Sequence, residues 1–205
     1  MSLWEFEEAC WSSGKELVCG ADEAGAGPLA GRVYAGAVIL PRHLELEGLN
    51  DSKQVSPKKR DQLFAQIQEK AVAWAVAWVE PDEIDEIDIL NSRIKAMQAA
   101  IDLLTPPSDY ALIDGNRDKG SRYSLTCPHE LIIKGDSRSA SIAAASILAK
   151  VCRDRYMVEM AKQYPEYQFE KHKGYGTKLH YELLDQYGPS PIHRRSFLKK
   201  WEMGR

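Results

Sequence analysis

The chain has 205 residues, of which 44% are hydrophobic and 28% are charged, and its formal net charge is −3. These values are typical of one globular domain with a sizeable core. No apolar run approaches the roughly 20 residues that a membrane span needs, which excludes a membrane protein. The acidic start of the chain lacks the basic region of a signal peptide, and the four cysteines are scattered without metal-ligand spacing. We therefore expect a cytoplasmic protein that forms a single domain over residues 1–205.

Charge is distributed unevenly along the chain. Residues 171–205 contain eight Lys or Arg and three Asp or Glu, although the whole chain is acidic. A basic segment of this kind is typical of a face that binds an anionic partner, but solvated helices also produce it. We expect residues 165–205 to form a basic, helical, substrate-binding portion of the domain.

The N-terminal part of the chain predicts a short helix followed by two strands and a second helix. Apolar residues recur at helical spacing over residues 3–11. An apolar run that ends in Asp22 and Glu23 predicts the first strand, and residues 33–40 predict the second. Ser56 and Pro57 are typical of a helix start, as N-cap and first helical residue.

The middle of the chain predicts a strand and then a long helix. Residues 71–79 alternate strictly between alanine and the larger Val and Trp, which is the period of a strand. We expect the large face to cover a core and the alanine face to let another element approach closely. From Pro81, an apolar stripe predicts one continuous helix that ends at Pro106.

The C-terminal part predicts two more strands, near residues 110–113 and 130–133, and each stops at an aspartate, Asp114 and Asp136. A helix rich in small residues follows over residues 137–164, and its composition predicts close packing on a sheet. A basic, glycine-hinged loop over residues 170–177 leads to a helix over residues 179–187 and a tail. Strands that alternate with helices predict an α/β fold.

Three predicted strands therefore end in carboxylates, namely Asp22 with Glu23, Asp114, and Asp136. Functional sites in α/β sheets form at strand ends, and like charges that converge there require a cation. Oxygen ligands favour Mg²⁺ or Mn²⁺ over zinc. Taken singly, Asp114 and Asp136 are explained equally well as turn or helix-capping residues. The set of three favours a metal site.

Several chemistries can be compared for such a site. Two-metal phosphoryl transfer fits a cluster of carboxylates. Glycoside hydrolysis fits poorly, because the strand neighbours Asp22 and Glu23 point to opposite faces. The loose dinucleotide motif of residues 25–30 would have to open a helix, whereas a strand follows it, and no Walker loop is present.

Eight sequence blocks, in the same order, resemble the bacterial ribonuclease HII family of type 2 ribonucleases H. The blocks are residues 20–31, 49–53, 112–115, 134–137, 141–151, 153–155, 172–177 and 193–197. The resemblance implies a ribonuclease H-like α/β fold: a mixed central β-sheet flanked by helices, with a C-terminal helical extension. It implies an endonuclease that hydrolyses the RNA strand of RNA–DNA hybrids. This enzyme would also nick duplex DNA on the 5′ side of embedded ribonucleotides, leaving 3′-hydroxyl and 5′-phosphate ends, and no obligate protein partner is inferred.

The resemblance also implies roles for individual residues. The two divalent metal ions, Mg²⁺ or Mn²⁺, would be held by Asp22, Glu23, Asp114 and Asp136. The substrate-binding residues would be Gly25, Ala26, Gly27, Ser52, Lys53 and Tyr175. The glycine-rich backbone would approach the ribose 2′-hydroxyl, which distinguishes RNA from DNA. Tyr175 would stack beside the RNA–DNA junction, and Ser52 and Lys53 would contact phosphate.

Two positions depart from the family pattern. The family has arginine between the two glycines, where this chain has Ala26, and usually has proline where this chain has Arg32. An arginine there would contact phosphate with a bidentate fork. We expect that activity persists and that the preference for the junction is weakened. The alternative is a non-catalytic or junction-insensitive protein that binds RNA–DNA hybrids on the same fold, although binding alone does not require the full set of carboxylates.

Overall fold

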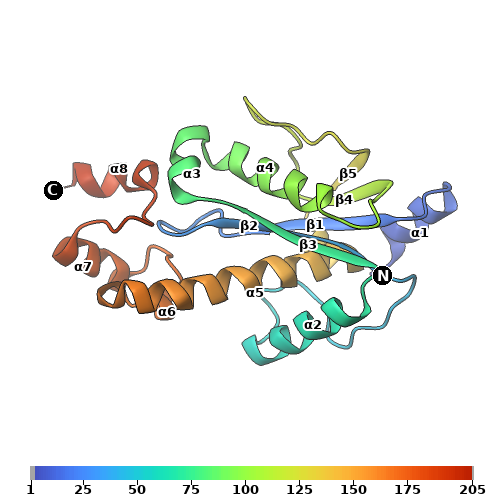
Figure 1. Ribbon diagram of the computed structural model, residues 1–205, viewed down its shortest axis with the longest axis horizontal. Coiled ribbons are helices and arrows are strands. Elements are labelled where there is room, and N and C mark those ends of the chain that lie inside the picture. Colours follow the sequence, from blue (N-terminus) through green and yellow to red (C-terminus); the bar gives the residue numbers. More distant parts are fainter. Residues whose placement is uncertain (1–2, 205) are drawn as a thin grey trace.

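The computed structural model describes residues 3–204 and contains one five-stranded sheet in the order β3-β2-β1-β4-β5 (Figure 1). β1 (Val18–Ala24) pairs antiparallel with β2 (Val33–Ile39) and parallel with β4 (Tyr110–Asp114). β3 (Ala73–Val79) pairs antiparallel with β2, and β5 (His129–Ile132) pairs parallel with β4. The sheet is therefore mixed, which confirms the predicted fold class.

The long helix α5 (Ala140–Gln163) crosses one face of the sheet over β1 and β2 (Figure 1). Small residues permit a very close approach there. A Cβ added at Gly20 would lie 2.1 Å from the backbone carbon of Ser141, and one at Gly36 would lie 2.4 Å from the carbonyl oxygen of Ala145. The backbones of helix and strands are thus in direct contact, as the small-residue composition predicted. The helix α2 (Pro57–Lys70) packs against α5.

The helix α4 (Ile89–Asp102) covers the opposite face of the sheet. The alanine face of β3 packs there with Ile94 and Met97, which confirms the expected close approach. The expectation that the large face covers a core is wrong, because Trp74 and Trp78 are 38% and 48% exposed. β3 is an edge strand, and α5 lies mainly over β1 and β2, so the tryptophan face stays partly uncovered.

The single helix predicted from Pro81 is two helices, α3 (Pro81–Ile87) and α4. Asp88 interrupts it with a φ of 68°, and its carboxylate accepts a hydrogen bond from the Asn91 N–H at 2.9 Å. This side chain caps the second helix. The apolar stripe continues across the break, so its period could not reveal the break.

The chain begins with α1 (Glu5–Ser12), as predicted. The long helix α5 begins later than predicted, because the turn η1 (Gly135–Ser137) precedes it and Ser139 caps it by accepting from the Ile142 N–H. Asp136 is therefore not the cap of this helix. No helix within residues 3–204 is long and apolar enough to cross a bilayer.

The C-terminal elements gather at one end of the sheet, beside the turn between β1 and β2 (Figure 1). They are η2 (Pro165–Tyr167), α6 (Phe169–His172), α7 (Lys178–Tyr187) and α8 (Arg195–Met203). The predicted tail thus contains a helix. These elements share a small core, built on Phe169 and Leu184, into which Leu29 and Ala30 also pack.

Candidate active site

The four predicted carboxylates come from neighbouring strand ends. Asp22 and Glu23 lie on β1, Asp114 is the last residue of β4, and Asp136 lies in η1 after β5. The parallel pairing of β1 and β4 places Ala21 opposite Ile113, so Asp22 and Asp114 follow side by side. The Gly135 N–H donates to Asp114 Oδ1 at 2.7 Å, which brings the residue before Asp136 to the same place. The structure therefore brings the predicted set together.

Burial and mutual repulsion disfavour negative charge at this cluster. Asp22 and Asp136 are only 6% and 9% exposed. Burial, and then the charges of Glu23 and Asp114, raise the pKa of Asp22 well above its usual range. Burial, and then Asp114, raise the pKa of Asp136 to about 6. A bound cation would remove this penalty, because it compensates charges that the protein leaves uncompensated.

Glu23 forms an ion pair that the sequence did not indicate. Its Oε1 lies 2.6 Å from Nη2 of Arg93 on α4. Burial raises the pKa of Glu23, although Arg93 lowers it. Its Oε2 is buried and has no hydrogen-bond partner among the described residues. Arg93 lies in a helix whose sequence signal is an apolar stripe, so no pattern pointed to it.

Within residues 3–204, no group of three or more acidic, histidine or cysteine side chains is preassembled to hold a metal ion. Asp22 Oδ1 accepts from the Glu23 N–H at 2.7 Å, and Arg93 holds Glu23. Without a cation, repulsion among the like charges favours side-chain orientations that keep the carboxylates apart. The donors nevertheless fit a hard divalent cation, because all are carboxylate oxygens and Glu23 Oε2 is an unpaired acceptor.

Two loops lie against each other beside the carboxylates: the glycine loop, residues 25–31, and the tyrosine loop, residues 172–177. The Leu29 N–H donates to the Gly174 carbonyl at 2.9 Å. Gly174 has a φ of 79°, and a Cβ there would lie 2.6 Å from the Ala30 carbonyl oxygen. Only glycine fits such a contact. Tyr175 is 42% exposed. The predicted substrate residues of the two loops therefore belong to one surface.

The predicted phosphate contacts lie on a third loop. Ser52 is buried and Lys53 is exposed. Burial alone would lower the pKa of Lys53, but Asp51 and then the site carboxylates outweigh burial and raise it. The Lys53 ammonium group therefore lies in the electrostatic field of the site. For Ser52, the structure shows burial and no contact with the carboxylates.

A cavity of about 420 Å³ lies beside Ala26, lined in part by Gly27, Arg93 and Arg117. Arg32 does not reach into it. The Arg32 guanidinium lies 2.7 Å from Glu80 and stacks between the rings of Trp78 and Tyr156, at 5.0 and 4.5 Å from their centres. Arg32 therefore does not replace the arginine that the family has at position 26.

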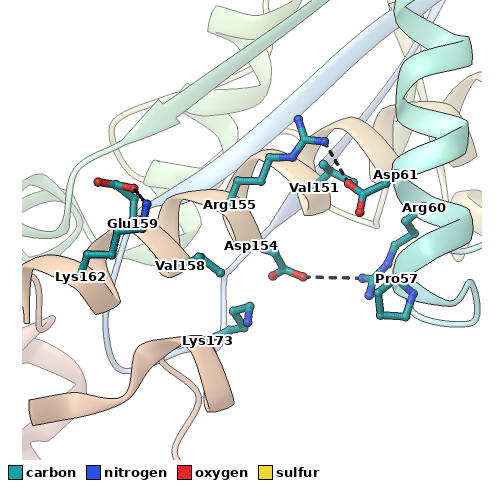
Figure 2. A pocket seen from close by; sticks show the side chains of 10 residues that line it. All are labelled: Pro57, Arg60, Asp61, Val151, Asp154, Arg155, Val158, Glu159, Lys162 and Lys173. Atoms are coloured by element: carbon teal, nitrogen blue, oxygen red, sulfur yellow. Dashed lines mark hydrogen bonds and ion pairs between the residues drawn. The ribbon is translucent and has the colours of Figure 1, made fainter. Parts of the chain in front are cut away.

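A larger cavity of about 620 Å³ lies between α2 and α5 (Figure 2). Ion pairs of 2.8 to 3.8 Å neutralise most of its basic side chains, and they are Arg60–Asp154, Arg155–Asp61 and Lys162–Glu159. None of the predicted site residues lines it. We therefore assign the chemistry to the strand ends and not to this cavity.

Three buried histidines support the tyrosine loop. The Nδ1–H of His180 donates to the Tyr175 carbonyl at 2.9 Å, and the Nε2 of His180 accepts from the Nε2–H of His193 at 2.9 Å. His193 Nδ1 accepts from the Ser190 hydroxyl at 2.7 Å, and the ring of His172 stacks on that of His180. Each ring has both nitrogens satisfied only in its neutral form. Burial lowers the pKa of His180 to about 4 and that of His193 to about 3.

This cluster makes stability depend on pH. Because both folded pKa values lie below the ordinary value of 6.5, the unfolded chain takes up protons first as the pH falls. The full contribution to stability is present above about pH 6.5 and is lost progressively below it, and the loss at pH 5 is at most about 2 kcal/mol per histidine. Urea unfolding between pH 7 and 4.5 measures this loss.

The raised pKa of Asp136 changes stability with pH in the opposite direction to the histidines. Substitutions are therefore needed to isolate the contribution of the histidines. His193→Gln should reduce the slope of stability against pH, whereas the exposed control His43→Gln should leave it unchanged. Equal slopes in wild type and His193→Gln would contradict the prediction.

The mixed five-stranded sheet and its flanking helices form a ribonuclease H-like fold, which solved ribonuclease H2 structures share. Residues 19–200 match the family model described as Ribonuclease HII. The chain is 50% identical over 198 residues to ribonuclease HII of Caldicellulosiruptor bescii, covering 97% of this chain and 94% of the relative. It is 52% identical over 181 residues to that of Idiomarina loihiensis, covering 88% and 95%.

Solved structures agree with this assignment. Ribonuclease H2 from Pyrococcus horikoshii OT3 superposes with a TM-score of 0.74 at 28% identity, covering 92% of this chain and 98% of that chain. The chain belongs to the ribonuclease HII family. Its activity is that of a ribonuclease HII, the cleavage of RNA in RNA–DNA hybrids and at ribonucleotides embedded in DNA. This membership sets aside the non-catalytic alternative.

Proposed function

We propose that Asp22, Glu23, Asp114 and Asp136 are the catalytic carboxylates and hold two divalent cations, Mg²⁺ or Mn²⁺. The observation that carries this proposal is the convergence of three strand ends on one buried, acidic edge. Two observations support it: Glu23 Oε2 is a buried acceptor without a hydrogen-bond partner among the described residues, although Oε1 is paired with Arg93, and burial and acidic neighbours raise the pKa of Asp22. When bound, the two cations supply activation of water and stabilisation of the leaving oxygen.

The proposed reaction is hydrolysis of the phosphodiester on the 5′ side of a ribonucleotide. Water adds to phosphorus, and the bond from phosphorus to the 3′ oxygen of the preceding nucleotide breaks. The products are a 3′-hydroxyl and a 5′-phosphate that stays on the ribonucleotide. Asp22 and Asp114, held rigidly by strand pairing, would hold the cations that bind the scissile phosphate.

We infer that the glycine and tyrosine loops read the substrate. Gly27 is exposed and has no atoms within 4 Å of an added Cβ, so ribose could approach its backbone. The exposed ring of Tyr175 would stack beside the deoxyribose that follows the ribonucleotide. Lys53 would contact a phosphate close to the carboxylates, and Ser52 is assigned there by sequence position alone.

Cleavage of a labelled DNA duplex that carries one ribonucleotide tests this proposal. We expect a nick on the 5′ side with Mg²⁺ or Mn²⁺ and none with chelator. A cut on the 3′ side, or a cut that persists in chelator, would overturn the two-metal assignment. If the enzyme cuts only within a long RNA–DNA hybrid, the proposed metal site is supported, and the proposal that the two loops recognise a single ribonucleotide is rejected.

Ala26→Arg should strengthen junction binding. The cavity beside Ala26 can accept the longer side chain, whose guanidinium could bind phosphate with two hydrogen bonds. We expect about tenfold tighter binding and a higher ratio of junction to hybrid cleavage, for a contact worth about 1.5 kcal/mol. Competition binding in Ca²⁺ measures this. Affinity and ratio equal to those of wild type would show that alanine is neutral here.

We also infer that residues 165–205 contact the duplex backbone, and that the enzyme acts on chromosomal duplexes in the cytoplasm. All four cysteines are free thiols, which suits a reducing compartment. Affinity for a hybrid should fall steeply as salt rises, because phosphate contacts release counterions. Fluorescence anisotropy between 50 and 200 mM salt, roughly the range over which such contacts weaken, measures the slope. No protein partner is proposed.

A further inference from the structure

Two fully buried arginines lie beneath the glycine and tyrosine loops. Arg194 and Arg153 are both 0% exposed. A buried guanidinium is costly unless its N–H groups are bonded, so the carbonyl groups that Arg194 and Arg153 do bind are held firmly. In Arg153 only Nη2 is bonded, because its buried Nε and Nη1 have no hydrogen-bond partner among the described residues. In both side chains the bound groups are backbone carbonyls of the two loops.

Arg194 binds the glycine loop from the N-cap position that precedes α8. Its side chain donates at 2.7 to 3.1 Å to the carbonyl oxygens of Gly25, Ala26, Pro28 and Gly31. The Arg194 N–H also donates to the Leu29 carbonyl at 2.9 Å. One residue therefore points most of the loop's carbonyls inward.

Arg153 of α5 connects the two loops. Its Nη2 donates to the Lys173 carbonyl at 2.8 Å and to the Ala30 carbonyl at 3.4 Å. Its guanidinium carbon lies 5.5 Å from the centre of the Tyr175 ring. A Cβ added at Gly25 would lie 2.2 Å from Arg153 Nε, so Gly25 rests directly on this side chain.

Because the carbonyl groups of the glycine loop point inward to the two arginines, its N–H groups face the outer side of the loop. Among the described residues, no hydrogen bond is recorded from the N–H of Ala26 or Gly27. Free N–H groups above two buried positive charges form a surface that favours a ribose oxygen or a phosphate. This arrangement does not require a side chain at position 26.

Given the proposed function, we propose that Arg194 and Arg153 are positioning residues for substrate reading. They fix the glycine loop and Tyr175 relative to each other, so that the backbone can select a single ribonucleotide. The shape of the loop is then independent of residue 26. Ala26 removes a phosphate contact and leaves ribose reading intact.

Arg194→Lys tests this, with Arg122→Lys as the matched control, because the Arg122 side chain is 54% exposed and lies outside the residues proposed to contact substrate. Lysine keeps the charge but cannot span four carbonyls. We expect Arg194→Lys to lower kcat/KM for a duplex with one ribonucleotide at least tenfold, mainly through KM. The loss on a long hybrid should be smaller, because many ribonucleotides can each bind. Equal losses on both substrates, or no loss, would overturn the proposal.

Hydrogen exchange of the metal-free protein supplies a readout that needs no activity. Arg194→Lys should speed exchange in residues 25–31 and 172–177 at least tenfold, while β1 and β4 stay protected. Unchanged exchange in both loops would overturn the proposal. If Arg194→Lys does not fold, Arg153→Lys is judged by the same two criteria. If wild type fails to cut at a single ribonucleotide, the proposed function fails, and exchange still decides the positioning role.

Discussion

Asp22→Asn and Asp114→Asn should each reduce turnover roughly a thousandfold or more while the fold is retained. Each substitution replaces an anionic oxygen ligand with a neutral amide in a site that would bind two cations. In the metal-free protein, Asp22→Asn should also raise the melting temperature or leave it unchanged. The physical reason is that it removes a buried carboxyl group whose pKa is raised by burial and by three acidic neighbours.

Steady-state cleavage in Mg²⁺ and thermal unfolding in chelator measure the two effects separately. Asp118→Asn is a suitable control, because Asp118 follows β4, the strand that ends at Asp114, but lies outside the proposed ligand set. A parallel fall in stability and activity for Asp22→Asn would show that its role is structural. Near-normal turnover in Asp114→Asn would remove it from the ligand set.

Gly20→Ala should destabilise the protein by about 3 kcal/mol or more, although a single methyl group is added. The new Cβ would lie 2.1 to 2.4 Å from three backbone atoms of Ser141 and Ile142. Backbone atoms at the start of α5 cannot rotate away as a side chain would, so helix and strand must separate. For a chain of this length we expect a fall in melting temperature of about 6–12 °C.

Gly27→Ala is the matched comparison, because a Cβ at Gly27 meets nothing within 4 Å. Its melting temperature should stay near that of wild type, whereas cleavage at a single ribonucleotide should weaken, since the methyl group would face the ribose. Calorimetry on both variants decides the first point. A Gly20→Ala protein as stable as wild type would mean that α5 can shift away from β1 at little cost.

The carboxylate edge could be predicted because local patterns determine it. Apolar runs that stop at Asp22, Asp114 and Asp136 specify strand ends, and parallel pairing brings such ends together. The alanine face of β3 was also predictable, since a strict period of two separates small from large side chains. Its tryptophan face was not, because exposure depends on the edge position of the strand, which the alternation does not encode.

Other features depend on contacts between distant residues or on one backbone angle. Arg93 binds Glu23 across 70 positions of sequence, and nothing in its own helix marks it. Asp88 ends a helix by adopting a φ of 68° while the apolar period continues past it. The sequence predicts only a tail where the structure has α8, although Phe197, Leu198 and Trp201 are at helical spacing. Arg194 lay within a recognised block, but its four carbonyl partners become visible only in three dimensions.

Because Arg194 binds the glycine loop, the order in which the chain is synthesised determines when each part of the site becomes available. All four proposed metal ligands are translated by residue 136, and the sheet that holds them is complete by β5 (His129–Ile132). The guanidinium that holds residues 25–31 comes from Arg194, which lies 58 positions after the last of these ligands. A ribosome-bound chain that ends between residues 136 and 194 would therefore contain every proposed metal ligand but lack the residue proposed to fix the loop that reads ribose.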